Sequence, residues 1–343
     1  MASRVNSPLR KTTLLVGVVA VLLLLRFAPV AGRVNPEETI RVQRPLMGTT
    51  WNIEVAGHGR TEAARAAIDR AYQELTRIDA LMSEWKPASP ISQVNWAAGK
   101  NPVEVPEELR SIIERSNRYS EMSDGAFDIT WHGMANIWHF DEQFVPPTQA
   151  MVDRARKFVN FRAIRIEGNR VFLPERGMSI GLGGIAKGYA VDRASQVLAR
   201  AGFDDSLVDG GGDIRVSGTR NGVPWQMGIQ DPRRERGTLI GRVPLTNGAI
   251  VTSGDYERFR IVDGVRYHHI IDARTGWPAT GACSVTVISP TAEQGVVLAK
   301  IMFIFGPEKA LAIARDQRVD MLLIDPAGMR YATEGFTRRF ESR

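Results

Sequence analysis

The sequence predicts one α+β domain of about 300 residues behind a short N-terminal targeting segment. Helix patterns with one apolar face alternate with short strand patterns between residues 50 and 324. No internal repeat, low-complexity tract or long linker divides the chain. Of its 343 residues, 43% are hydrophobic and 24% are charged, which is typical of a globular protein and excludes a largely disordered one.

Residues 1–33 are predicted to be a signal peptide or an N-terminal membrane anchor. A positive segment ending at Lys11 precedes an apolar run of fourteen uncharged residues, 12–25. That run is short for a membrane-spanning helix, which needs about 20 residues, and it fits the core of a signal peptide. Small residues at 29–32 favour cleavage, whereas a longer span over 12–30 that includes Arg26 favours a retained anchor.

In either case the body, residues 34–343, is expected outside the cytoplasm. The positive flank keeps the N-terminus inside and sends the body across. We therefore expect a periplasmic protein, released or tethered to the inner membrane by residues 12–30. No cysteine follows the apolar run, which excludes a bacterial lipoprotein.

The charge and cysteine content exclude several functions. Residues 1–33 hold five of the 44 Lys and Arg residues and no acid, leaving 39 basic against 38 acidic residues. An almost neutral body argues against a nucleic-acid groove. The single cysteine, Cys283, excludes an internal disulfide, a CxxC redox motif and a cysteine-cluster metal site, and it fits a small apolar side chain in a strand.

The elements of the body follow from periodicity, caps and turns. Asp263-Gly264 supplies the positive φ angles of a two-residue hairpin turn, and Thr291 with Gln294 forms a capping box. The expected elements are a strand over 50–55, a helix capped by Thr61, a helix from Pro106, strands over 164–167 and 170–173, a helix from the 181–184 turn to Arg200, a hairpin over 258–271, a helix from Thr291 to Gly306, and a strand over 321–324.

Two glycine-rich turns are candidate ligand sites. The turn at 181–184 opens a helix, where backbone amides and the helix N-terminus favour a phosphate. Its spacing is neither the dinucleotide fingerprint nor the P-loop, so a tight packing turn is the alternative. The second turn, 209–213, carries two acids and is either a ligand-facing loop or a corner between strands.

His268 and His269 lie on the arm of the predicted hairpin, directly before the loop 272–276. Strand alternation places them on opposite faces, so they cannot chelate one metal together. One of them is a candidate general base, because only histidine has an unperturbed pKa near neutral pH. The sequence contains no nucleophile elbow of the Ser-His-Asp type.

These segments belong to a longer ordered set that covers nearly the whole body. The set comprises Met47-Gly-Thr49, Met82-Ser-Glu-Trp85, residues 89–95, Gly125-Ala-Phe-Asp-Ile-Thr130, residues 183–192, the 209–213 turn, Ser253-Gly-Asp-Tyr256, and Tyr267-His-His-Ile-Ile-Asp272 with Arg274-Thr-Gly276 and Pro278. In this order the segments resemble the ApbE-type FAD:protein FMN transferases.

The resemblance implies a single mixed-sheet domain that holds FAD in a cleft. It implies transfer of FMN, through its phosphate, to a Thr or Ser hydroxyl of a client flavoprotein, with release of AMP. We expect that client to be a membrane or periplasmic redox protein, and we expect no nucleic-acid partner. His269 matches the base. The positions that match FAD contacts are Met47, Trp85, Ala126, Phe127, Asp128, Gly181, Lys187 and Ile270.

For Met47, Trp85 and Phe127, core packing is the alternative interpretation. The two roles are compatible, because a flavin ring favours an apolar, aromatic wall.

The sequence departs from the family pattern at three positions. Gly181 stands where the pattern has Asp, and Val296 and Lys300 stand where it has the Asp and Thr that hold Mg²⁺. Only the backbone carbonyl of Gly184 remains as a metal contact, and a divalent cation without carboxylate ligands binds weakly.

Two interpretations of these departures follow. In one, Lys300 replaces the metal as the phosphate-binding cation and is catalytic. In the other, the chain is a non-catalytic FAD- or FMN-binding accessory protein of a periplasmic respiratory system. A membrane-anchored binding module without a cofactor is disfavoured by the matches to the flavin wall.

Overall fold

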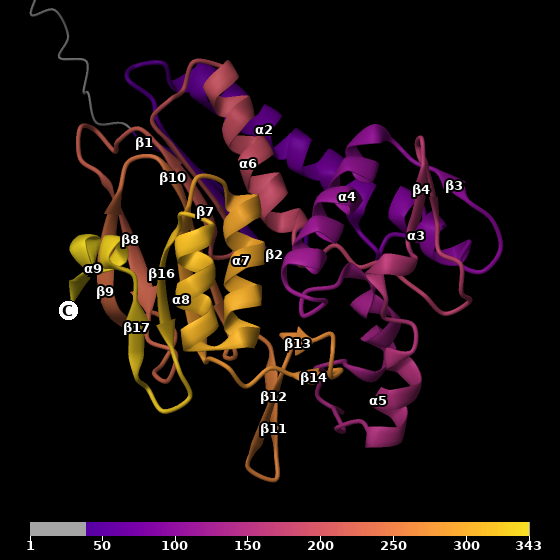
Figure 1. Cartoon of the computed structure of the whole chain (residues 1–343). Coiled ribbons are helices and arrows are strands. Elements are labelled where there is room, and N and C mark those ends of the chain that lie inside the picture. The colour runs from indigo at the N-terminus through magenta and orange to yellow at the C-terminus, as the bar shows by residue number, and fades with distance from the viewer. Residues whose placement is uncertain (1–38, 343) are drawn as a thin grey trace, which may run out of the picture.

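The computed structural model describes residues 39–342, so the predicted signal peptide or anchor, residues 1–33, lies outside the described residues. The central element is an eight-stranded sheet in the order β1-β2-β6-β7-β10-β15-β16-β17 (Figure 1). Its strands are β1 (Thr39–Leu46), β2 (Thr49–Ala56), β6 (Ser206–Gly210), β7 (Asp213–Ser217), β10 (Gly248–Gly254), β15 (Ser284–Ser289), β16 (Asp320–Ile324) and β17 (Arg330–Ala332).

The predicted α+β class is confirmed, but the expectation of a mixed sheet is wrong. Every neighbouring pair of strands in the large sheet is antiparallel. The connection between β15 and β16 shows why. Two consecutive helices, α7 (Ala292–Phe305) and α8 (Pro307–Asp316), join these strands, so the chain returns to the end of the sheet at which β15 stops and β16 runs back antiparallel to it. A single crossover helix would have produced a parallel pair.

Both faces of the sheet are covered. On β10, Val251 packs in the hydrophobic cluster that contains α7 and α8. The preceding residue, Ile250, packs against a three-stranded sheet on the other face. This alternation is the period-2 pattern of a strand buried on both sides. The second face is covered by β8 (Trp225–Gln230), β9 (Leu239–Leu245), β18 (Glu341–Ser342) and α9 (Glu334–Arg339).

A largely helical lobe is inserted between β2 and β6 and lies beside the sheet in Figure 1. Its longest helix, α2 (Thr61–Met82), packs against α6 (Ala186–Arg200) and joins the lobe to the main core. The other elements are α3 (Pro90–Trp96), β3 (Val103–Glu104), α4 (Glu107–Met122), the 3₁₀ helices η1 (Ile129–Ile137) and η2 (Phe161–Ala163), α5 (Gln149–Arg156), β4 (Arg165–Glu167) and β5 (Arg170–Phe172).

Local signals predicted most element boundaries. The hairpin consists of β11 (Phe259–Val262) and β12 (Val265–His268), with φ angles of 50° at Asp263 and 77° at Gly264. A short strand pair follows, β13 (Ile271–Asp272) with β14 (Trp277–Pro278). Thr291 caps α7 as expected and accepts from Gln294 N at 3.3 Å. The expected cap at Thr61 is wrong, since Thr61 is the first helical residue and Arg60 is the N-cap.

Within residues 39–342, no helix combines the length and apolarity needed to cross a bilayer.

Candidate functional site

The 181–184 turn lies against the segment that follows α4. A Cβ at Gly184 would lie 2.8 Å from Cε2 of Phe127, and a Cβ at Gly181 would lie 2.9 Å from Cβ of His132. The amide of Gly181 donates to the carbonyl of Ile129 at 2.8 Å. Two of the glycines are therefore required for close packing, and this packing places the turn and Phe127 in one wall.

Asp128 holds that wall in shape. Its Oδ1 accepts from the amide and hydroxyl of Thr130 at 2.7 and 2.6 Å, and its Oδ2 accepts from Phe161 N at 2.9 Å. Burial raises the pKa of the Asp128 carboxyl. The structure thus places Asp128 as the N-cap of η1. The carbonyl of the neighbouring Ala126 accepts from Ala273 N at 3.3 Å, which joins the wall to the loop behind the hairpin.

Lys187, in the first turn of α6, connects the two glycine-rich turns. Its Nζ lies 3.0 Å from Oδ2 of Asp213, a buried carboxylate at the start of β7. Asp209, at the other end of the second turn, accepts from Gly212 N at 2.8 Å. Burial raises the pKa of the Asp209 carboxyl. A hydrogen bond therefore holds the second turn in shape, and its Asp213 carboxylate faces Lys187, which follows the first turn.

Lys300 adds a second ammonium group to the same place. It lies one helical turn after Val296 on α7, and its Nζ donates to the Val296 carbonyl at 3.2 Å. Burial lowers the pKa of Lys300 to about 8, with the Asp213 carboxylate acting against this shift and the Lys187 ammonium adding to it. The two ammonium groups can bind an anionic ligand at this place.

The two adjacent histidines differ sharply. His268 is buried, its Nδ1 accepts from Ile270 N at 3.2 Å, and its Nε2 donates to the Ala279 carbonyl at 2.9 Å. His269 instead has a buried Nδ1 that meets no hydrogen-bonding partner anywhere in residues 39–342. Burial and the nearby charges of Lys300 and Arg258 lower the pKa of His269 to about 3, so its imidazole is neutral. Of these two adjacent histidines, only His269 has a buried ring nitrogen without a hydrogen-bonding partner among residues 39–342.

Met47 lies on the tight turn between β1 and β2. Its φ of 49° falls in the left-handed region, which a methionine adopts only at a cost in backbone strain. Strain of this kind is concentrated at functional sites. A Cβ at the next residue, Gly48, would lie 3.7 Å from Nη2 of Arg258, whose carbonyl accepts from His269 N at 3.1 Å. The turn therefore lies on the His269 side of the site.

Trp85 and Ile270 have opposite environments. The Trp85 indole is 76% exposed, which is unusual for so large an apolar side chain, and its ring meets His132 edge-on at 5.8 Å. Ile270 is buried in the core cluster beneath α7. The structure thus brings His269, Lys300 and Lys187 together, sets Phe127 and Trp85 along the first glycine turn, and places Asp128 and Ile270 in the supporting scaffold.

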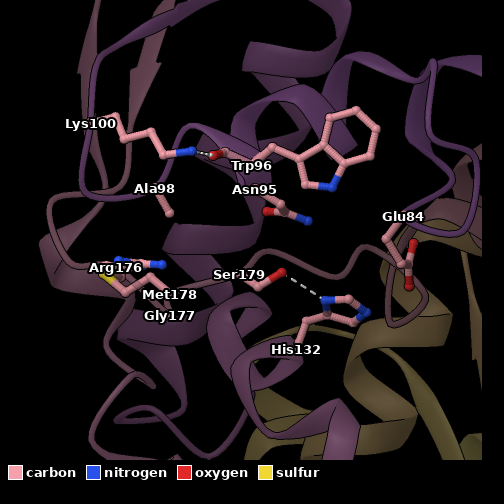
Figure 2. A pocket seen from close by; sticks show the side chains of 10 residues that line it. All are labelled: Glu84, Asn95, Trp96, Ala98, Lys100, His132, Arg176, Gly177, Met178 and Ser179. Carbon is pink, nitrogen blue, oxygen red and sulfur yellow. Dashed lines mark hydrogen bonds between the residues drawn. The ribbon is translucent and has the colours of Figure 1, made fainter.

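A cavity of about 310 Å³ adjoins the Trp85 end of this site (Figure 2). It contains none of the residues predicted to be catalytic. His132 connects it to the site, because the ring contacts Trp85 and packs on Gly181. The lining residues are Glu84, Asn95, Trp96, Ala98, Lys100, His132, Arg176, Gly177, Met178 and Ser179.

Comparison with known proteins supports the resemblance that the motifs carry. A family model described as the ApbE family matches residues 47–323. This chain belongs to the ApbE family. An ApbE relative from Treponema pallidum, an FAD:protein FMN transferase, is 32% identical over 343 residues, covering 94% of each chain. Another from Vibrio cholerae is 30% identical over 317 residues, covering 89% of this chain and 94% of the relative.

The fold of ApbE proteins is also shared. The crystal structure of the ApbE protein from Thermotoga maritima superposes with a TM-score of 0.80 and 32% sequence identity. It covers 88% of this chain and 99% of the other.

The residues of this ApbE protein do not fit the magnesium ion that the resemblance implies. In the part of the chain that the structure describes, no group of three or more His, Cys, Asp or Glu side chains could hold a metal. Val296 offers no side-chain ligand, and the Lys300 ammonium donates a hydrogen bond to the Val296 carbonyl. The carbonyl of Gly184 alone does not make a site for a hard divalent cation.

The sequence motifs did not identify two polar residues beside the 181–184 turn, Glu84 and His132. Glu84 precedes Trp85, and burial raises the pKa of its carboxyl against the opposing effect of a hydrogen bond with the Leu182 backbone. Its place in the Met82–Trp85 motif could have marked it. His132 had no signal of its own, because its role depends on Gly181, which is distant in sequence.

Proposed function

We propose that this chain is an FAD:protein FMN transferase. It would attach FMN through its phosphate to a Thr or Ser hydroxyl of a client flavoprotein and release AMP. The observation that carries the proposal is the neutral imidazole of His269, whose Nδ1 has no hydrogen-bonding partner among the described residues, beside the Lys300 ammonium. Membership of the ApbE family, whose relatives in Treponema and Vibrio are FAD:protein FMN transferases, supports it.

The chemistry follows from the positions of these groups. The client hydroxyl gives its proton to His269 as its oxygen attacks the FMN phosphorus. The bond between that phosphorus and the bridging oxygen breaks, and AMP leaves with the electron pair. Phosphoryl transfer depends mainly on positioning and on charge neutralisation. The ammonium groups of Lys187 and Lys300 supply the charge.

FAD itself would adjust the base. In the free protein, burial and neighbouring positive charge hold the pKa of His269 at about 3. A pyrophosphate between His269 and the lysines brings negative charge, which favours the protonated imidazole and raises this pKa. The base would therefore become competent when its substrate is bound.

The charge of Lys300 takes the place of the metal in this proposal. A magnesium ion with one carboxylate carries the same net charge as one ammonium group. We therefore propose catalysis without Mg²⁺, with Lys300 as the cation on the phosphate. The alternative, a non-catalytic FAD- or FMN-binding accessory protein of a periplasmic respiratory system, is favoured by the absence of acidic or hydroxyl side chains at Gly181, Val296 and Lys300.

One experiment separates the two. The purified protein is incubated with FAD and a client that carries a flavinylation-site threonine, with and without EDTA. Covalent FMN on the client, equal in both samples, is the expected result. Bound FAD without transfer under any metal condition would identify the accessory protein.

We further propose that the body acts in the periplasm, free or tethered by residues 12–30, on a membrane or periplasmic redox protein. The charge pattern of residues 1–33 supports this. A fusion of residues 1–40 to a reporter that is active only outside the cytoplasm should be active, and an inactive fusion would refute export.

A further inference from the structure

His132 occupies the space that a side chain at residue 181 would need. A Cβ at Gly181 would lie 2.9 Å from Cβ, 3.1 Å from Cδ2 and 3.2 Å from Cγ of His132. These atoms are the Cβ of His132 and the ring atoms next to it. They cannot move aside as the far end of a long side chain can. The glycine at 181 and the histidine at 132 are therefore a matched pair, and the family pattern has an acidic residue at 181.

The ring of His132 is fixed on one side and open on the other. Nδ1 shares a hydrogen bond of 2.8 Å with the hydroxyl of Ser179, and the ring meets Trp131 edge-on at 5.9 Å. Nε2 is buried and finds no hydrogen-bonding partner within residues 39–342. In Figure 2 Nε2 points away from Ser179, toward the side on which Glu84 is drawn. A buried polar atom without a partner is costly, and a ligand that completes it is stabilised.

The chemistry of Nε2 suits a neutral ligand edge. Burial lowers the pKa of His132, so the ring is uncharged near neutral pH. The Ser179 hydroxyl can donate to Nδ1 or accept from it. Nε2 is correspondingly free to act as a donor or an acceptor.

The other groups near His132 are already engaged or are suited to a flat ring. Asn95 uses both ends of its amide on the backbone of Ile180, at 2.7 and 2.9 Å, and so fixes the segment before Gly181. Glu84 makes a hydrogen bond with the backbone of Leu182, and its Oε1 would lie 3.8 Å from a Cβ at Gly183. The Trp85 indole stands 76% exposed beside His132 and offers an open aromatic face. An aromatic face beside an unpartnered ring nitrogen is the recognition chemistry of a planar nitrogen heterocycle.

We propose that His132 is a substrate-binding residue whose Nε2 hydrogen-bonds the polar edge of a nitrogen heterocycle of FAD stacked on Trp85. In this role His132 would replace the acidic residue that the family pattern has at position 181. The inference rests on the proposed function in that FAD is the ligand. FAD has two such rings, adenine and isoalloxazine, and they share this chemistry.

The first test is a titration of the full chain with FAD, followed by flavin fluorescence. His132→Phe keeps the shape of the ring and removes its nitrogens, and we expect at least tenfold weaker binding. His139→Ala, on an exposed histidine of the same segment, is the matched control and should bind normally. Parallel isothermal titrations with AMP and FMN identify the ring, because only the ligand that contains it loses affinity in the variant.

Normal FAD affinity in a folded His132→Phe protein would overturn this inference and leave the proposed function intact. Failure of the unaltered protein to bind FAD would overturn both.

The second test uses the pairing with residue 181 and does not depend on the stability of one variant. Gly181→Asp alone should weaken FAD binding, because its Cβ meets His132. Adding His132→Gly should restore affinity above that of either single variant, since it removes the His132 Cβ that lies 2.9 Å from the new Cβ and the carboxylate then serves the ligand. Additive losses would contradict the exchange of roles.

Discussion

The Nζ atom of Lys300 lies 3.2 Å from the carbonyl oxygen of Val296. Val296 and Lys300 stand at the two positions where the family pattern has metal ligands, and here they are hydrogen-bonded to each other. A cationic side chain thus takes the position of a ligand for a cation. Burial, and after it the same ammonium, lowers the pKa of His269. Replacing Lys300 by a neutral residue is therefore expected to raise the pKa of the base.

Removing the charge of Lys300 should abolish transfer and weaken FAD binding. Lys300→Met is expected to lower FAD affinity by at least tenfold, or about 1.4 kcal/mol, since a buried ammonium on a pyrophosphate makes a charge-assisted bond. Lys300→Arg should retain most of the affinity. Lys309→Met, on an exposed lysine of α8, is the control. Binding that EDTA abolishes in the unaltered protein would contradict the role of Lys300.

The affinity for FAD should fall as the pH rises through about 8. The pKa of Lys300 is lowered from 10.5 to about 8 in the free protein, and Asp213 and Lys187 are the charged groups that face it. A bound pyrophosphate stabilises the ammonium and raises this pKa, so above pH 8 binding must take up a proton. Affinity then falls by up to about tenfold per pH unit. Isothermal titration of Lys300→Arg should show a flat profile, and an equal slope in both proteins would exclude Lys300 as the group responsible.

The two histidines should separate chemistry from stability. His269→Ala should bind FAD and lose FMN transfer, because it removes the only unpartnered ring nitrogen of the pair. His268→Ala removes two buried hydrogen bonds, so its melting temperature should fall while the folded protein still transfers FMN. Mass spectrometry of the client and thermal denaturation distinguish the two effects. Transfer by His269→Ala would mean that another group is the base.

Local patterns could predict the elements but not the sense of the sheet. The Asp263-Gly264 turn and the Thr291 cap depend on neighbouring residues, and the structure contains both. The antiparallel pairing of β15 with β16 depends instead on how α7 and α8 together return the chain to the sheet. That path is set by packing between distant segments, which periodicity does not report.

The same division holds at the site. The resemblance to the family singled out Lys187, His269 and Lys300, and the structure places these side chains together. The partners of Asp128 could not be foreseen, because the amide of Phe161 that binds its Oδ2 lies 33 residues later. His132 was missed for a similar reason, since its meaning depends on a glycine in a different segment.

Asp128 therefore needs a test that separates scaffold from ligand contact. Asp128→Ala removes the acceptor of two buried amides and of the Thr130 hydroxyl proton, and it should lower the free energy of unfolding by at least about 2 kcal/mol. Weaker FAD binding is expected as well, because the Ala126–Phe127 wall loses its support. Chemical denaturation and FAD titration are measured on the same preparations. Normal stability with weak binding would make Asp128 a direct ligand of FAD instead.

The final prediction is that the metal requirement can be installed. Val296→Asp together with Lys300→Thr supplies the carboxylate and hydroxyl of the family pattern beside the Gly184 carbonyl, which are oxygen ligands suited to Mg²⁺. FAD binding and transfer in this double variant should depend on Mg²⁺ and be lost in EDTA, whereas the unaltered protein is indifferent to both. Val296→Asp alone is the control. It adds a buried carboxylate beside the Lys300 ammonium, cancels the charge that holds the pyrophosphate, and should weaken FAD binding at any Mg²⁺ concentration. If the double variant gains transfer with Mg²⁺ while the unaltered protein never transfers, the lysine has replaced the metal in charge only, and the accessory interpretation is correct.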